Sequence, residues 1–271
     1  MTSVPEQDLA LFADHSILPD SYLKLKPCQL GTIAHVQGTS PAWLVSSLIE
    51  NAIIGTATTT NRDINKKIPN RSHVVYISFT NTKSVVVKNC KRNGLSLDTD
   101  KNFTFHDCLT DLFTKHIKDT SKSKEAVQKF FGDLRTAIEN ISHESTLIIL
   151  ENPELLLAAT DFDSNSLIYF ISSLQTISNS VFVIINAEPS LIDFDSVLTT
   201  EVVPKVTDFF VKLLHKSSIN VNLSPLATGR AEDITGCLTI SKGAVPSPTA
   251  VAENEFIYNV TKEGSVKLFF R

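Results

Sequence analysis

The fold is decided by residues 31–54, which read GTIAHVQGTSPAWLVSSLIENAII. The first seven form a short apolar stretch between two glycines, a pattern typical of a buried strand. A turn is predicted at Gly38-Thr39-Ser40-Pro41, with Ser40 as helix cap and Pro41 in the first helical position. Apolar residues then follow at helical spacing from Trp43 onward. The segment therefore predicts a strand, a glycine turn and a helix in direct succession.

Proteins that hold nucleotide phosphates use the same frame, but their chemistry needs particular residues in the turn. The motif G-x-x-x-x-G-K-[ST] supplies backbone N–H groups and a lysine for the phosphates, and a hydroxyl for Mg²⁺. Here the second glycine, the lysine and the hydroxyl residue are missing, and Trp43 and Leu44 stand in their region. The sequence thus predicts the frame of a phosphate-binding loop without its chemistry.

Composition narrows the class of protein. The 271 residues are 42% apolar and include 16 phenylalanines, enough for a sizeable core. A net charge of −4 excludes a generally basic nucleic-acid coat but allows a local basic patch. The four cysteines lie far apart without a C-x-x-C pair, so we expect neither a metal site nor disulfides. Without a membrane span or a signal peptide, the chain is expected in the cytoplasm and the nucleus.

Strands and helices alternate through the first two thirds of the chain. Buried strands are expected at 73–79, near 103–105, at 146–151 and at 181–185, with amphipathic helices between them. This alternation predicts a largely parallel sheet covered by helices on both faces. The polar, threonine-rich segment at about 55–72 predicts a surface loop.

The last third changes character. Half-buried strands are expected at 218–223, 233–241, 255–260 and 266–270, with a hairpin turn at Lys262-Glu263-Gly264. They predict an antiparallel extension, over about 218–271, on one edge of the parallel sheet. The whole chain, residues 1–271, is expected to be a single α/β domain.

Two groups of polar residues are candidates for function. Glu151 ends the strongest apolar strand, where a carboxylate could hold Mg²⁺ through water or could cap the following helix. With Gly38, Ser40 and Trp43 it marks the expected degenerate nucleotide site. The second strand ends in Ser78-Phe79-Thr80 and lacks a carboxylate to activate water, so no catalytic residue is assigned. His35, within the first strand, is expected to be a core histidine.

Basic residues form the second group. They form either a solvated face or a phosphate-contacting surface, because flexible cations follow an RNA backbone without reading its bases. The preferred phosphate contacts are Arg230, next to Gly229, and Lys66, Lys67 and Arg71 in the polar loop.

The last two strands carry the expected contact surface. Four apolar side chains there follow period-two spacing, so each strand's pair shares one face: Phe256, Tyr258, Leu268 and Phe270. This face is expected to be buried, either on the sheet or against a neighbouring subunit.

Several segments, in order along nearly the whole chain, resemble the family of Elongator complex subunit six from budding yeasts. The longest reads NLSPLATGRAEDITG at 222–236, and the others are QDLALF at 7–12, RSH at 71–73, ILENPELLL at 149–157, VAENEFIY at 251–258 and VKLFFR at 266–271. Residues 55–72 and 80–102 are the least similar. Each segment alone is a weak signal, but together they are specific.

The resemblance implies a function. Subunits four, five and six of Elongator look like RecA-type ATPase domains without the usual nucleotide motifs. They form a hetero-hexameric ring that joins the catalytic subcomplex of subunits one to three and binds tRNA, whose wobble uridines Elongator modifies. This chain would then be a non-catalytic RecA-like subunit without a cofactor. The alternatives are an ATPase with an unconventional site at Gly38 to Trp43 with Glu151, and a monomeric enzyme unrelated to nucleotides.

Overall fold

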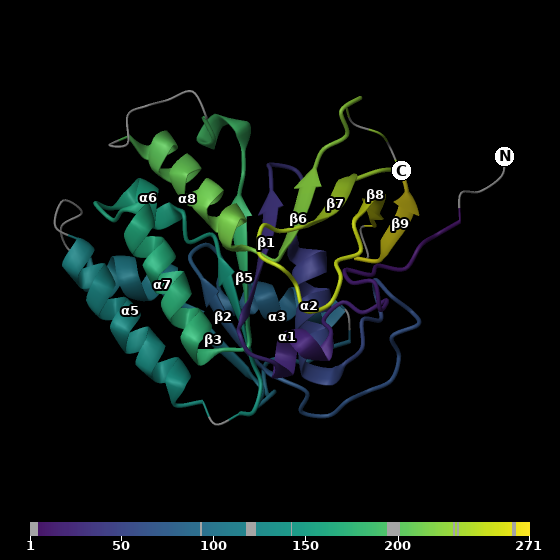
Figure 1. Ribbon diagram of the computed structural model, residues 1–271, viewed down its shortest axis with the longest axis horizontal. Coiled ribbons are helices and arrows are strands. Elements are labelled where there is room, and N and C mark those ends of the chain that lie inside the picture. Colours follow the sequence, from purple (N-terminus) through teal and green to yellow (C-terminus); the bar gives the residue numbers. More distant parts are fainter. Residues whose placement is uncertain are drawn as a thin grey trace.

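One nine-stranded sheet runs through the molecule, with helices on both of its faces (Figure 1). The computed structural model describes residues 5–92, 94–117, 123–141, 143–193, 201–229, 231, 233–261 and 264–271. The strand order is β3-β2-β4-β5-β1-β6-β7-β8-β9. The strands are β1 Gln29–His35, β2 His73–Ser78, β3 Phe103–Asp107, β4 Thr146–Glu151, β5 Ser180–Asn186, β6 Ile219–Ser224, β7 Gly236–Lys242, β8 Asn254–Val260 and β9 Val266–Phe270.

The helices divide between the two faces. One apolar core lies under α1, α2 and α3, and a second lies under α4 to α8. The helices are α1 Asp20–Lys24, α2 Ala42–Ile54, α3 Lys83–Arg92, α4 Cys108–Asp111, a π-helical turn Leu112–His116, α5 Lys124–Glu139, α6 Leu155–Ala159, α7 Ser164–Ile177, a 3₁₀ turn Pro189–Leu191 and α8 Val202–Lys216. None of the described helices is both long and apolar enough to cross a membrane.

The central strands are apolar on both sides because both faces are covered. In β5, Phe182 and Ile184 enter the core under α2, whereas Val181, Val183 and Ile185 enter the core under α7. A side chain at Gly31 of β1 has no room, since its Cβ would lie 2.4 Å from the ring of Phe182. The predicted parallel α/β sheet is confirmed, and the near-continuous apolar runs follow from it.

The antiparallel extension begins later than the sequence predicts. β6 pairs with β1 in parallel, so the expectation that the strand at 218–223 is antiparallel is wrong. Only β7, β8 and β9 are antiparallel. The reason is α8, a helix that was not identified from the sequence. It follows β5 and returns the chain to the edge at which the parallel strands begin, so that β6 runs in the same direction as β1. An amphipathic helix between two strands is the usual parallel crossover.

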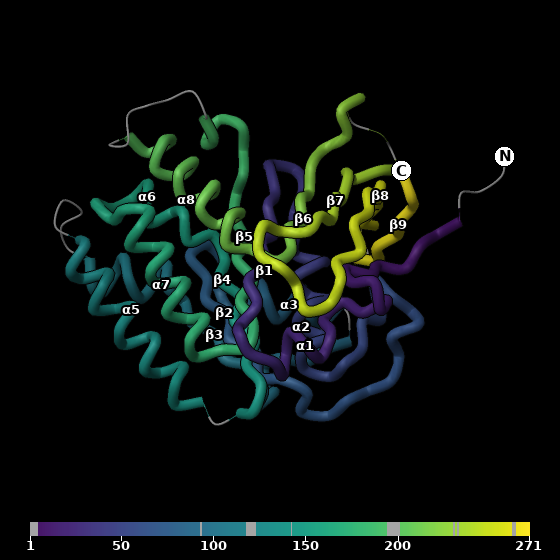
Figure 2. Tube along the Cα trace, in the orientation of Figure 1, coloured from purple at the N-terminus to yellow at the C-terminus, as the bar shows by residue number. Residues whose placement is uncertain are grey.

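The segment at 55–72 is a loop, as expected, but it is packed rather than solvated. Ala57, Thr60 and Asn61 are buried, and the Asn61 amide donates to the Leu9 carbonyl at 2.8 Å. The N-terminal segment passes between this loop and the last strands, where Gln7 bridges to Leu268 (Figure 2). The loop therefore connects the N-terminal segment to the core.

Candidate functional site

A cleft of about 490 Å³ lies at the carboxyl ends of β1, β2 and β4, where α/β sheets of this class bind ligands. The turn after β1 and the start of α2 form one wall. The strand ends carry the polar groups: His35, Tyr76, Asn81, Glu151 and Asn186. None of the described lining residues is a lysine or an arginine, so the cleft lacks a cation for phosphate groups.

Three backbone donors in and beside the turn are used within the chain. The Val36 N–H donates to the Thr39 hydroxyl at 3.1 Å, and the Thr39 N–H donates to the Val36 carbonyl at 3.1 Å. The Gln37 N–H donates to the Glu188 carboxylate, which reaches over from the end of β5, at 2.8 Å. In a phosphate-binding loop such N–H groups point at the ligand. Here a side-chain anion of the chain already occupies one of them.

The start of α2 differs by one residue from the prediction. Pro41 is the cap and Ala42 begins the helix, whereas the Ser40 hydroxyl accepts only a long 3.4 Å bond from the Ala42 N–H. Gly38 has a φ of +87°, a conformation that favours glycine. The predicted strand, turn and helix are thus present, with Ser40 on the cleft wall rather than as a helix cap.

Glu151 does not cap a helix. Its Oε2 accepts from the Ser78 hydroxyl at 2.5 Å and its Oε1 from the Asn81 amide at 2.7 Å, both from the end of β2. α6 begins only at Leu155, and Glu154 is its cap residue, so the helix-capping hypothesis is wrong. The carboxylate therefore ties the ends of β2 and β4 together.

Burial shifts the pKa of two other ionisable groups at these strand ends. Burial lowers the pKa of His35, which lines the cleft half-buried rather than lying in the core as expected. Glu154 is fully buried, and burial raises the pKa of its carboxyl to about 7. The Glu154 Oε1 accepts from the Asn152 amide at 2.8 Å and from the Asn186 N–H at 2.9 Å. The sequence reading missed Glu154, although ENPE at the end of an apolar strand places two carboxylates close together.

Trp43 faces away from this cleft. Its side chain is 8% exposed and packs on Tyr258, with ring centroids 5.3 Å apart. It lines a neighbouring cavity of about 350 Å³, whose lining also includes Arg92. The residue in the region of the missing lysine is thus part of the core and of the contact between α2 and β8.

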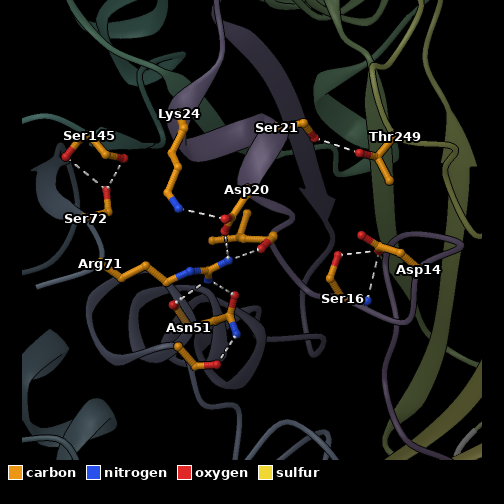
Figure 3. A network of polar contacts seen from close by, with 12 residues as sticks. Asp14, Ser16, Asp20, Ser21, Lys24, Asn51, Arg71, Ser72, Ser145 and Thr249 are labelled. Carbon is orange, nitrogen blue, oxygen red and sulfur yellow. Dashed lines mark hydrogen bonds and ion pairs between the residues drawn. The ribbon is translucent and has the colours of Figure 1, made fainter. Parts of the chain in front are cut away.

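Arg71 lies at the centre of a polar network that ties α1 to α2 (Figure 3). Its Nη1 donates to the carbonyl and side-chain oxygens of Asn51 at 2.9 and 2.7 Å. Its Nη2 donates to the Leu18 carbonyl at 2.6 Å and to Asp20 at 3.2 Å. The side chain is only 8% exposed. This geometry gives Arg71 a structural role and removes it from the phosphate-contact candidates.

The other basic candidates have different outcomes. Lys66 and Lys67 are exposed on the packed loop and stay candidates. Arg230 lies outside the described residues, as do Lys262 and Glu263 of the expected hairpin turn. The structure adds a basic cavity of about 270 Å³, which is lined by Arg92, Lys267 and Arg62, the last paired with Glu6 at 3.2 Å. Sequence reasoning missed it because these residues come from a loop, the end of α3 and β9.

The hairpin face predicted for contacts lies mostly inside the chain. Phe256, Tyr258 and Leu268 are buried in the core under α2, so they cannot meet a neighbouring subunit directly. Phe270 is 53% exposed and stacks on Phe256 with ring centroids 5.2 Å apart. The sequence left open whether this face is buried on the sheet or against a neighbouring subunit. Three of the four residues are buried in the chain's own core, and only Phe270 remains a contact candidate.

The fold defines the class of protein, a RecA/KaiC-like α/β domain with antiparallel C-terminal strands. Two solved structures share it at 8–11% identity. They are a KaiC-like protein from Pyrococcus horikoshii, with a TM-score of 0.58 over 98% of this chain and 100% of that one, and the flagellar accessory protein FlaH from Methanocaldococcus jannaschii, with a TM-score of 0.56 over 90% of each. Models of protein families gave no match.

Sequence comparison identifies the family. The chain is 31% identical to Elongator complex protein 6 of Saccharomyces cerevisiae over the full length of both. It is 22% identical to the Elongator complex protein 6 homolog of Schizosaccharomyces pombe over 70% of this chain and 76% of that protein. The chain therefore belongs to the Elongator complex protein 6 family.

Proposed function

We propose that this chain is a non-catalytic subunit of Elongator, which forms a hetero-hexameric RecA-like ring with subunits four and five. In this proposal the ring joins the catalytic subcomplex of subunits one to three, binds tRNA and supports wobble-uridine modification, in the cytoplasm and the nucleus. The observation that carries the proposal is the full-length similarity to Elongator complex protein 6. The RecA-like fold supports it, because this is the architecture expected of the ring.

The geometry of the cleft supports the non-catalytic part of the proposal. A triphosphate with Mg²⁺ needs backbone donors, a cation and a free carboxylate. Here the turn is bonded to Thr39 and Glu188, the described lining lacks a cation, and Glu151 is held by Ser78 and Asn81. The alternative, an ATPase with an unconventional site at Glu151, needs several of these contacts to break.

The basic cavity supports a tRNA contact on this subunit. The chain as a whole is acidic, so RNA has to meet local positive charge. Arg92 is held beneath the last hairpin, where a Cβ at Gly264 would lie 3.1 Å from its Cδ. Lys267 and Arg62 line the same cavity, and hydroxyls of the lining can donate to phosphate oxygens. We propose that this cavity, together with Lys66, Lys67 and Arg230, forms the phosphate-contacting surface.

Co-assembly tests the ring. The full chain is co-expressed with subunits four and five, and mass is measured by size-exclusion chromatography with light scattering. We expect a hexamer for the wild type and a weakened one for Phe270→Ser, with Val85→Ser, another exposed apolar position, as the matched control. A wild-type chain that stays monomeric in the presence of both subunits contradicts the proposal.

A salt titration tests the tRNA contact. In the assembled ring, Arg92→Ala with Lys267→Ala is expected to weaken all tRNAs alike and to lower the salt slope by about two phosphate contacts. Lys129→Ala, an exposed lysine on α5, is the control. An intact ring with unchanged affinity and salt slope places the RNA surface elsewhere.

A further inference from the structure

A second large hollow, of about 610 Å³, lies on the outer side of the helical layer, between α5 and α7. The two helices run side by side there (Figure 1). The groove is separate from the cleft at the strand ends and from the basic cavity, with which it shares no lining residue. Its lining combines aromatic rings with polar residues: Phe131, Gly132, Arg135, Phe162, Tyr169 and Phe170 are the ones that define it.

The floor of the groove is aromatic. Phe131 of α5 and Phe170 of α7 stack face to face, with ring centroids 3.6 Å apart, and Phe162 meets Phe131 edge-on at 5.7 Å. At the margin, Tyr169 is 77% exposed, more than any other large hydrophobic side chain described. Aromatic rings of this kind are the side chains that most often anchor protein partners.

Gly132 lines the groove and adds no side chain to it. It lies in the middle of α5, where glycine is less favourable than alanine. Steric crowding does not explain the glycine, because a Cβ at this position would have no described heavy atom of another part of the chain within 4 Å. The contrast is Gly31, where the Phe182 ring leaves no room. At Gly132 the missing side chain instead adds space to the groove.

Among the described residues that line the groove, Arg135 is the one with a charged side chain. Its Nη2 pairs with Glu139 at 2.8 Å, but its Nε is buried and has no acceptor among the described residues. A buried donor without an acceptor is costly, and the Arg135 side chain is 43% exposed, so a ligand acceptor that draws the guanidinium outward can satisfy Nε as well as pair with the charge. The charge favours a carboxylate, and one cation is too few for a nucleic-acid backbone.

We propose that the groove between α5 and α7 is a docking site for a short segment of another protein chain. That segment carries a large apolar side chain, aromatic or leucine, for the floor of Phe131 and Phe170, and a carboxylate for Arg135. This site goes beyond the proposed ring and tRNA functions, and its test needs neither subunits four and five nor RNA.

The test selects random 12-residue peptides displayed on phage against the immobilised full chain and measures the enriched peptides by fluorescence anisotropy. We expect a shared pattern of an aromatic residue or leucine with an aspartate or glutamate. Phe170→Ala is expected to weaken binding at least 10-fold, and Arg135→Gln about 10-fold. For a peptide whose acid is changed to the amide, Arg135→Gln should matter little.

Gly132→Ala separates docking from stability. It should raise the melting temperature by about 2 °C, because alanine favours the helix. The same change should weaken peptide binding about 5-fold, because its methyl group enters the groove. Lys129→Ala, on α5 but outside the groove, is the control and should leave binding unchanged. Enrichment no better than on the empty support, a basic consensus, or binding that is indifferent to both Gly132→Ala and Arg135→Gln overturns the proposal.

Discussion

The cleft at the strand ends and the groove between α5 and α7 differ in how far the chain satisfies their polar groups itself. In the cleft, the N–H groups of Val36, Gln37 and Thr39 and both oxygens of Glu151 have partners within the chain. In the groove, the Arg135 Nε has none among the described residues, and Gly132 adds no side chain to the lining.

This difference indicates where a partner is expected to bind. A site whose donors and acceptors are already paired offers little to a ligand, because each new bond replaces an old one. A site with an unpaired buried donor and an aromatic floor gains from association. On this account the cleft is structural, although its place in the fold is that of a nucleotide site, and the groove is a contact surface.

The largest expected effect comes from placing a lysine at Trp43, in the region of the missing motif lysine. Trp43→Lys should destabilise the chain by about 4 kcal/mol, because it removes a packed indole from Tyr258 and introduces a charge into the core. It should not produce ATP hydrolysis, since the glycine and hydroxyl residues of the motif remain absent. Urea unfolding and a phosphate-release assay measure both, with Trp43→Phe as the size control. A stable variant that hydrolyses ATP would contradict a purely structural role of the cleft.

Arg71→Ala should have the next largest effect, a loss of about 3 kcal/mol of unfolding free energy. The guanidinium donates four hydrogen bonds to α1, α2 and the chain before α1, and its removal leaves buried acceptors unpaired. Lys67→Ala, on the exposed part of the same loop, should change stability by less than about 0.5 kcal/mol. If the two variants unfold alike, the structural role given to Arg71 is wrong.

Burial of Glu154 makes the stability of the chain depend on pH. Its folded-state pKa of about 7 lies above the ordinary 4.5, so the folded state binds the proton more tightly than the unfolded chain. Its contribution to stability is therefore fully present below pH 4.5 and falls as the pH rises to about 7. Glu154→Gln keeps an oxygen for Asn152 and Asn186, and should be more stable than wild type at pH 8 by on the order of 2 kcal/mol.

That gain should vanish near pH 4.5, so unfolding is measured at several pH values between 4.5 and 8. Glu125→Gln, at an exposed carboxyl, should show no such trend. A constant difference between Glu154→Gln and wild type across this range argues against a buried, protonated Glu154.

The smallest expected effect is at the turn. Glu188→Ala removes the carboxylate from the Gln37 N–H and should cost about 0.5–1 kcal/mol, as for one partly exposed hydrogen bond. Hydrogen exchange at the Gln37 amide should become faster, while Thr39 should be unaffected because its bonds lie within the turn. An unchanged Gln37 amide means that Glu188 does not close the turn in solution.

The strands of the parallel sheet were predictable because burial on both faces leaves an uninterrupted apolar run. Thr146–Glu151 is the example, and its neighbours in the sheet follow the same pattern. α8 was missed although Val206, Phe209 and Leu213 lie at helical spacing, and with it the parallel direction of β6 was missed. Local patterns give elements, but the direction of a strand depends on the crossover before it.

The candidate site was predictable in place but not in detail. The glycine turn after β1 and Glu151 at the end of β4 do meet in one cleft. That Glu188, Ser78 and Asn81 occupy the donors and acceptors could not be read from sequence, because these contacts join segments about 70 to 150 residues apart. The same reason hid the role of Arg71, whose partners lie in α1 and α2.

Equilibrium titration of the purified chain with labelled ATP and Mg²⁺ measures whether the cleft is a structural remnant without nucleotide affinity. The account predicts no saturable binding in the low-micromolar range, for the wild type and for Glu151→Gln alike. Saturable low-micromolar binding by the wild type that is lost in Glu151→Gln would contradict it and favour an ATPase site at this cleft.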